Sequence, residues 1–222
     1  MKKLGIIGGA GPLASALLYE TLIHESLALG QSVPEIVLLN YPFSRGLSME
    51  EGKKNEQVIE KELEYCLSLL SCCAVDVALL ACNTLHLFLK RLTTSIEFYH
   101  LPTLVLRTAQ QYPHKRLLVL GTQNTRHCGL YQHAQMEMSY PSQEEQSLIE
   151  DVIDRVLQGR LLQQDADLMG DVIKSCISRD AIDGVILGCS DFPVLHHHFP
   201  IQTVLPIYDS IKIPAKTLVS VL

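Results

Sequence analysis

The sequence predicts an α/β fold of two pseudo-symmetric lobes, each a parallel sheet flanked by helices, with the active site in the cleft between them. Two observations predict it. Near-continuous apolar strands alternate with amphipathic segments, which is typical of a parallel sheet covered on both faces, and segments of the first half recur in the second. With 222 residues, 47% of them hydrophobic, the chain can supply cores for two lobes of about 100 residues.

The first half of the chain alternates between apolar strands and segments with helical spacing of apolar residues. A glycine-rich turn follows the first strand, and Gly30 ends the helix after it, as a C-terminal glycine does. The strands are expected at residues 3–8, 34–40 and 76–81, and the helices at 13–29, 55–74 and 85–92.

The second half repeats this alternation. The stretch KRLLVLGT is a buried strand that ends in a polar turn, and GVILGC is a later one. The strands are expected at residues 115–122 and 184–189, and the helices at 143–158, 165–179 and 208–222.

An internal repeat relates the two halves. KLGIIGG (3–9) matches RLLVLGT (116–122) at an offset of 113, and DVALLACNT (76–84) matches DGVILGCSD (183–191) at an offset of 107. Buried parallel strands resemble one another, so the first match alone carries little. The second match is more specific. Both segments begin with an acidic residue, continue with five apolar or small residues, and end with a cysteine and two small polar residues. Two lobes that face each other would place Cys82 and Cys189 on opposite sides of one cleft.

The position of these two cysteines suggests acid–base chemistry. A thiol between a strand and a helix lies near backbone N–H groups and the helix dipole, which favour the thiolate and should lower the pKa. Asn83 or Thr84, and Ser190 or Asp191, are placed to cap the following helices. Free N–H groups at these positions could hold a substrate carboxylate. Two thiols on opposite faces of a carbon atom suit inversion of a stereocentre by two bases.

Composition excludes several classes of partner. The net charge of −6 and the absence of a Lys/Arg run argue against nucleic acid or an anionic membrane surface. The apolar N-terminal stretch is broken by glycines and Pro12, so it reads as strand, turn and helix rather than as a signal peptide. Seven cysteines without a disulfide-rich composition indicate a reducing, cytoplasmic setting. We expect a small, soluble partner molecule.

Three stretches, GIIGGAGPLAS, ACNTLH and LGCSDF, together resemble the aspartate/glutamate racemase superfamily, and the first is most similar to its aspartate racemase branch. The resemblance covers nearly the whole chain and includes LGTQNTRHCGLY and PSQEEQ. It implies a cofactor-independent racemase of aspartate or a related amino acid, without pyridoxal phosphate or metal, and a homodimer. It also implies that the last helix returns to the first lobe, which gives lobes of 1–99 with 207–222 and of 100–206.

The resemblance also implies roles for individual residues. Cys82 and Cys189 match the two acid–base thiols of the family. The groups that match those around the substrate carboxylate are Asn83, Thr84 and Ser190, with Thr122 and Thr125 nearby and Asp191 where the family usually has Glu.

Two departures leave the substrate side chain open. Arg45, in NYPFSRG, matches the family's side-chain-binding arginine only approximately, and a solvated loop charge explains it equally well. The lysine of aspartate-specific members falls on Leu157, where Arg155 or Arg160 could compensate.

Three alternatives remain at this stage. GAGPLA (9–14) fits the outline of a dinucleotide-binding turn, but the second strand ends in Asn40 rather than an acidic residue. His86 follows Cys82 by four residues, so a cysteine-nucleophile isomerase, decarboxylase or hydrolase is conceivable, although a core histidine is the simpler interpretation. The third alternative is a non-catalytic amino-acid-binding protein. The run His196–His198 is read as a surface feature, because adjacent histidines do not converge on one metal ion.

Overall fold

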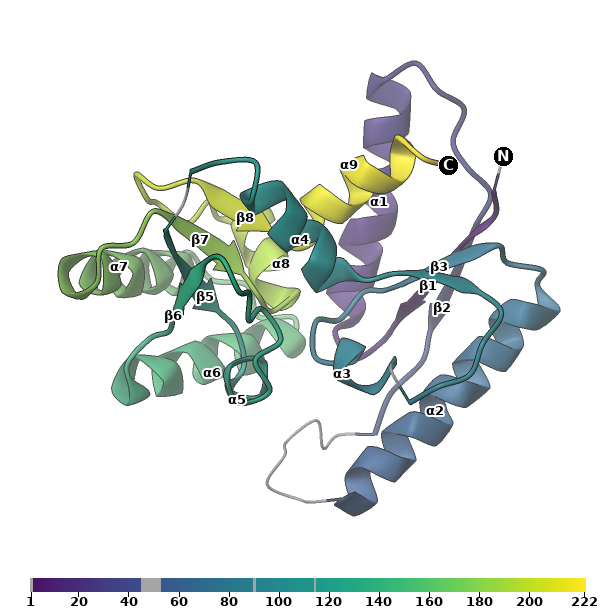
Figure 1. The fold of residues 1–222 in the computed structure, drawn as a ribbon, viewed down its shortest axis with the longest axis horizontal. Coiled ribbons are helices and arrows are strands. Elements are labelled where there is room, and N and C mark those ends of the chain that lie inside the picture. Colours follow the sequence, from purple (N-terminus) through teal and green to yellow (C-terminus); the bar gives the residue numbers. More distant parts are fainter. Residues whose placement is uncertain (1, 45–52, 90, 114) are drawn as a thin grey trace.

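The computed structural model describes residues 2–44, 53–89, 91–113 and 115–222. In these residues, two four-stranded parallel sheets lie side by side (Figure 1). The strand order is β2-β1-β3-β4 in the first sheet and β6-β5-β7-β8 in the second, so the two lobes share one topology. The strands are β1 (Leu4–Gly8), β2 (Ile36–Asn40), β3 (Val77–Leu80), β4 (Glu97–Tyr99), β5 (Arg116–Leu120), β6 (Glu137–Ser139), β7 (Gly184–Leu187) and β8 (Ile207–Asp209).

Helices connect the strands and cover the sheets. In Figure 1, α2 lies on the outer side of the first sheet, whereas α1 and α9 lie between the lobes. The helices are α1 (Pro12–Ala28), α2 (Lys53–Cys72), α3 (His86–Leu89), α4 (Leu101–Ala109), α5 (Gln123–His127), α6 (Gln143–Leu157), α7 (Gln163–Arg179), α8 (Asp191–His198) and α9 (Lys212–Val219).

The internal repeat is preserved in the register of the sheets. Leu4 pairs with Val77 in the first sheet, and Leu117 pairs with Gly184 in the second. These pairs are related by the same offsets of 113 and 107 residues that the sequence shows. The central strand pairs of the two lobes are therefore equivalent residue by residue, and whatever follows β3 has a counterpart after β7.

A continuous apolar core joins the lobes. Helix α1 packs against α9 and α8, and α4 packs against α9 and β8. Buried residues of β1 and α1 belong to the same hydrophobic cluster as those of β5, β7 and α9. Helix α9 thus packs on α1, the first helix of the first lobe. Residues 207–209, which we assigned to the first lobe, instead form β8 and pair with β7 in the second sheet.

The sequence did not reveal the shortest elements. Three edge strands of three residues each, β4, β6 and β8, are too short to show a period. Helices α4 and α8 were also missed, and among the described residues of the helix expected over 85–92 only the single turn of α3 is helical. In α4 and α8 a proline lies in the first turn, where it is compatible with a helix. In the sequence alone, a proline argues against a helix, so these two were not predicted.

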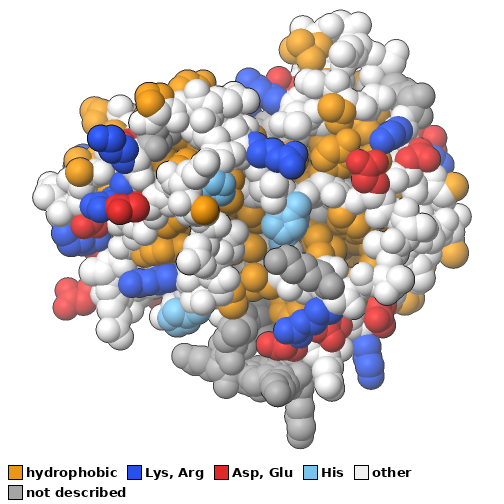
Figure 2. All heavy atoms as spheres, viewed as in Figure 1, with side chains coloured by type: hydrophobic (Ala, Val, Ile, Leu, Met, Phe, Trp, Pro, Cys, Tyr) orange, Lys and Arg blue, Asp and Glu red, His pale blue; other side chains and the backbone are white. Residues whose placement is uncertain are grey.

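The surface shows no dominant charge on the face seen in Figure 2, where positive and negative side chains are interspersed. None of the helices in the described part of the chain is long and apolar enough to cross a lipid bilayer.

Candidate active site

Cys82 and Cys189 occupy equivalent positions in the two lobes. Each is the second residue after the end of a central strand, β3 or β7. Both are largely buried, with 8% and 7% of their surface exposed. They lie near enough for the charge of a Cys82 thiolate to help raise the pKa of Cys189. The structure therefore brings together the two thiols that the repeat predicts to face each other.

The surroundings of Cys82 act on its thiol in opposite directions. The pKa of Cys82 is raised to about 11, mainly by burial and also by the negative charge of Asp191. Hydrogen bonds from the backbone N–H groups of Leu85 and Thr84 lower it, but by less. These N–H groups stabilise the thiolate once it forms, although they do not make it the resting state.

Cys189 lies beside a carboxylate. Its Sγ is 3.4 Å from Oδ2 of Asp191, to which the thiol donates a hydrogen bond. Burial raises the pKa of Cys189 well above its ordinary value, and the charge of Asp191 adds to this effect. Burial likewise raises the pKa of the Asp191 carboxyl to about 6, while the bond from Cys189 opposes that shift. At neutral pH the proton of this pair stays on sulfur.

The expectation that the strand–helix junction lowers the thiol pKa is wrong for this conformation. The local N–H groups do act in the expected direction. However, the closed interface between the lobes removes water from both sulfur atoms and places the Asp191 carboxylate beside them. Desolvation and a neighbouring negative charge both favour the neutral thiol, and together they outweigh the helix terminus.

Asn83 connects the lobes. Its side-chain Oδ1 accepts a 2.5 Å hydrogen bond from the hydroxyl of Tyr131, and its Nδ2 donates to Oγ of Ser210 at 3.2 Å. All three side chains are buried. The sequence suggested that Asn83 caps α3. The structure shows instead that its side chain bonds to Tyr131 and Ser210. One N–H of its amide group remains for another acceptor, because Nδ2 carries two hydrogen atoms.

The other expected carboxylate-binding residues lie at the same ends of the sheets. Thr84 and Ser190, each in the turn after a central strand, are buried. Ser190 is the N-cap residue of α8, but its side chain makes no capping hydrogen bond, contrary to expectation. Thr122 does cap α5, where its hydroxyl accepts from the N–H of Thr125 at 3.3 Å. The Thr122 and Thr125 hydroxyls are also 3.2 Å apart.

His86 has a structural role. Its Nε2 accepts a hydrogen bond from the N–H of Leu101 at 3.1 Å, so Nδ1 carries the proton and donates to the carbonyl of Cys82 at 2.8 Å. Burial lowers the pKa of His86 to about 3, and the nearby His100 adds to that shift. The ring is neutral and contacts the backbone of Cys82, so the core interpretation of this histidine is the one that the geometry supports.

The residues expected to read the substrate side chain do not converge. Arg155 is held in a two-pronged ion pair with Asp165, in which Nη2 lies 2.7 Å from Oδ1. Leu157 is 40% exposed at the end of α6, and Arg160 is exposed in the following loop. Arg45 lies outside the described residues.

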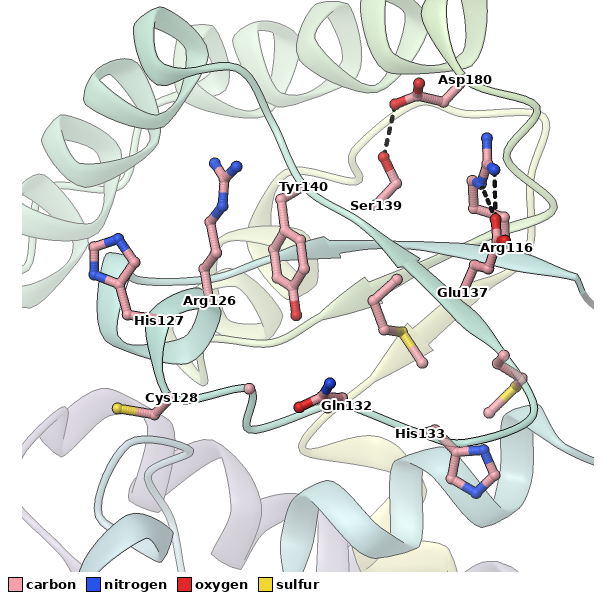
Figure 3. A pocket seen from close by; sticks show the side chains of 13 residues that line it. Arg116, Arg126, His127, Cys128, Gln132, His133, Glu137, Ser139, Tyr140 and Asp180 are labelled. Atoms are coloured by element: carbon pink, nitrogen blue, oxygen red, sulfur yellow. Dashed lines mark hydrogen bonds and ion pairs between the residues drawn. The ribbon is translucent and has the colours of Figure 1, made fainter.

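A cavity of about 710 Å³ lies elsewhere, in the second lobe beside β6 (Figure 3). Its charged groups are committed to one another: Arg116 pairs with Glu137, and Ser139 donates to Asp180. Arg126 lies over the ring of Tyr140. A second hollow of about 510 Å³ lies between α4 and the loop after α5. Neither is lined by Cys82 or Cys189, so the buried thiols, and not the open hollows, define the candidate site.

The three consecutive histidines form the last turn of α8. His196 Nδ1 accepts from the N–H of Ile201 at 3.0 Å, and the rings of His197 and His198 contact each other. Among the described residues, no cluster of histidine, cysteine or acidic side chains has the arrangement of a metal site.

A comparison with models of protein families decides the assignment. The model for Asp/Glu/Hydantoin racemase matches residues 7–218. The chain belongs to this family. It is an isomerase of the racemase type, and both lobes and both thiols lie within the matched region.

Solved structures of racemases share the fold over the full length of this racemase. An aspartate racemase from Picrophilus torridus is similar with a TM-score of 0.77 and 23% identity, covering 99% of this chain and 94% of the other. A putative Asp/Glu racemase from Yersinia pestis gives a TM-score of 0.79 at 20% identity, covering 99% and 98%. A glutamate racemase isoform from Bacillus anthracis gives 0.70 at 16% identity, covering 100% and 81%.

Two residues near the thiols of this racemase were not identified from the sequence. Tyr131 lies within LGTQNTRHCGLY, one of the stretches that carry the resemblance, so its position was a usable signal. Ser210 follows β8, a strand that the sequence did not reveal, and nothing local to it indicates a contact with Asn83.

Proposed function

We propose that the chain is a cofactor-independent amino-acid racemase that uses Cys82 and Cys189 as its two bases. One observation carries this proposal: the two thiols stand at equivalent positions after β3 and β7, in sheets of matching register, on opposite sides of one interface. A substrate α-carbon between them would present one face to each sulfur. A reaction with a single base would need only one of these thiols, and a binding function would need neither.

The proposed reaction moves two protons. A thiolate on one side removes the α-proton, and the thiol on the other side donates its proton to the opposite face of the carbon. The enzyme then holds the thiol and thiolate in exchanged positions, and proton exchange with solvent restores the starting form. Because burial and the charge of Asp191 favour the neutral form of both thiols, substrate must help to form the thiolate. The charge of Asp191 raises the pKa of both thiols. The α-ammonium group of the substrate offsets this charge and so favours the thiolate.

The substrate carboxylate is proposed to lie at the turns after the central strands. The candidate donors are the remaining N–H of Asn83, the hydroxyls of Thr84 and Ser190, and the backbone N–H groups of these turns. Thr122 and Thr125, after β5, hold each other and define the adjacent wall. Donors at this position also stabilise the negative charge that develops when the α-proton leaves.

The proposed substrate is aspartate or a related small amino acid. Two basic residues were considered as replacements for the missing lysine. Arg155 is already neutralised by Asp165, and Arg160 is exposed in the loop after α6. The choice of side chain therefore rests on residues other than Arg155, with Arg45 as one candidate. The homodimer and the cytoplasmic setting remain predictions from the sequence.

The test is a chiral assay of the purified protein against the common amino acids, run in heavy water. We expect inversion of at least one amino acid, with deuterium incorporated at the α-carbon of the product. Cys82→Ser and Cys189→Ser should each abolish racemisation, whereas Cys72→Ser, which changes an exposed thiol, should not. Retained racemisation in either site variant contradicts the two-thiol mechanism.

A cysteine-nucleophile function has less support. Its base would be His86, whose Nδ1 is bound to the backbone carbonyl of Cys82 and whose Nε2 is bound to Leu101. A dinucleotide-binding function has less support as well, because the Asp191 carboxylate packs on Gly11 at the turn where a pyrophosphate would have to lie.

A further inference from the structure

Three segments of the chain meet at the side chain of Asn83. Asn83 follows Cys82 in the first lobe. Tyr131 comes from the loop after α5 in the second lobe, and Ser210 comes from the turn through which the chain crosses from β8 to α9. Both hydrogen bonds of the Asn83 amide group therefore join it to segments far away in the sequence, and the bond to Tyr131 crosses to the second lobe. Both bonds are buried, so a movement of the second lobe away from the first must break the bond to Tyr131.

Tyr131 also contacts the residue that precedes Cys189. A Cβ atom at Gly188 would lie 3.0 Å from Cε2 of the Tyr131 ring, so the ring rests directly on the backbone of Gly188. The N–H of Gly188 donates to the carbonyl of Leu120 at 2.6 Å, which ties this backbone to β5. Tyr131 is fully buried, with 0% of its surface exposed. One rigid side chain thus spans from the residue before Cys189 to the residue after Cys82.

The third member of the network is fixed independently. The Asp209 carboxylate accepts hydrogen bonds from the N–H groups of Ile211 and Lys212, at 2.7 and 2.8 Å, and thereby caps the start of α9. Ser210 lies inside this capped turn and is fully buried. Asn83 is therefore held from two sides, by the Tyr131 hydroxyl and by Ser210 at the start of the helix that packs on α1.

We propose that Tyr131 is a positioning residue that sets the separation of the two thiols, through its ring on Gly188 and its hydroxyl on Asn83. This inference rests on the proposed racemase function. A two-base reaction needs both sulfur atoms within reach of one carbon atom, and a displacement of about 1 Å can cost roughly 100-fold in rate. A tyrosine suits this role because its ring is rigid and its length is fixed.

Tyr131→Phe is the sharpest variant, because it keeps the ring on Gly188 and removes only the hydroxyl that holds Asn83. Proton removal by one thiol needs a single sulfur at the α-carbon, whereas inversion needs both. We expect the rate of inversion to fall about 10- to 100-fold with KM nearly unchanged. Deuterium should then accumulate in recovered substrate of unchanged configuration, because the thiol that removes the proton returns one from solvent. The ratio of exchange to inversion should rise.

The control is Tyr140→Phe, which removes a hydroxyl from a partly buried tyrosine of the same lobe, beside β6. It should leave the ratio as in the wild type. If Tyr131 had a purely structural role, the rates of α-proton exchange and of inversion would fall by the same factor, since fewer molecules would be folded. An unchanged ratio in Tyr131→Phe therefore overturns the proposal.

A second measurement separates this inference from the proposed function. Amide hydrogen exchange, followed by mass spectrometry, needs no substrate. Tyr131→Phe should speed exchange in the segments that contain Asn83 and Ser210, relative to both wild type and Tyr140→Phe. If the wild type inverts no amino acid, the proposed function fails. Amide hydrogen exchange of the protein still reports on the contact between the lobes in that case. If amide hydrogen exchange in both segments is the same in Tyr131→Phe as in the wild type, the positioning role of Tyr131 is overturned, whatever the activity.

Discussion

The carboxylate of Asp191, in the second lobe, lies against Gly11, in the first. Oδ1 is 2.7 Å from the position that a Cβ atom on Gly11 would occupy. Gly11 is the N-cap residue of α1, with φ −127° and ψ 94°, a conformation open to any residue. Glycine is therefore required here by the approach of the other lobe and not by its own backbone. The same carboxylate touches Cys189, so the closure of the lobes and the environment of a thiol are set by one side chain.

Gly11→Ala should force the lobes apart or displace Asp191. We expect a loss of about 1–3 kcal/mol of unfolding free energy, as for other overpacked sites, and a lower racemisation rate. Urea unfolding measures the first and the chiral assay the second. The matched control is Gly11→Ala in an Asp191→Ala background, where the obstacle is absent. A cost as large there as in the wild-type background would show that capping of α1, rather than contact between lobes, explains the effect.

Asp191→Asn should shift both thiol titrations to lower pH, because the charge of Asp191 contributes to raising the pKa of Cys82 and Cys189. Alkylation of each cysteine by iodoacetamide as a function of pH, mapped by mass spectrometry, checks this, with the exposed Cys72 as internal reference. Titrations that stay in place, or move to higher pH, contradict the assigned electrostatics.

The same variant should change stability in a pH-dependent way. The folded-state pKa of Asp191, about 6, exceeds its ordinary value of 3.8, so its contribution to stability is complete below pH 3.8 and is lost as pH rises through 6. Relative to wild type, Asp191→Asn should therefore be more stable at pH 7.5 than at pH 4, by on the order of 2–3 kcal/mol at most. Urea unfolding at the two pH values measures the difference.

His86 should matter for stability and not as a titrating base. Its folded-state pKa of about 3 lies below its ordinary value of 6.5. Its contribution is thus complete above pH 6.5 and is lost as pH falls toward 3. His86→Phe removes both hydrogen bonds and should cost about 2–4 kcal/mol at pH 7, with a much smaller cost at pH 4. His24→Phe, at an exposed site, is the control. An equal cost at both pH values would contradict a neutral, buried imidazole.

Arg155 should stabilise the second lobe without affecting the choice of substrate. Arg155→Met leaves the buried Asp165 carboxylate without its partner, and we expect a loss of about 3 kcal/mol of unfolding free energy. The relative kcat/KM values for different amino acids should remain as in the wild type. Arg155→Met with Asp165→Asn should recover part of the lost stability. A changed substrate preference would instead show that Arg155 contributes to the choice of substrate.

Periodicity and repetition predicted the larger part of the fold. The apolar runs at β1, β3, β5 and β7 and the amphipathic helices α2, α6 and α7 lie where the sequence placed them, because each is long enough to show its period. The edge strands β4, β6 and β8 and the proline-containing helices α4 and α8 were not predicted. They are defined mainly by what they pack against, and that information is not local.

By itself, the sequence determined that a cysteine follows each central strand at equivalent positions, since a repeat along the chain becomes a repeat in space when the strands pair in the same register. Only the tertiary structure decided the state of those cysteines. Local N–H groups favour the thiolate, but the closed interface removes water and brings in Asp191 from the other end of the chain. The same interface turned Asn83 from an expected helix cap into a bridge to Tyr131 and Ser210. Burial and contacts between lobes act through space, and no pattern within either segment contains them.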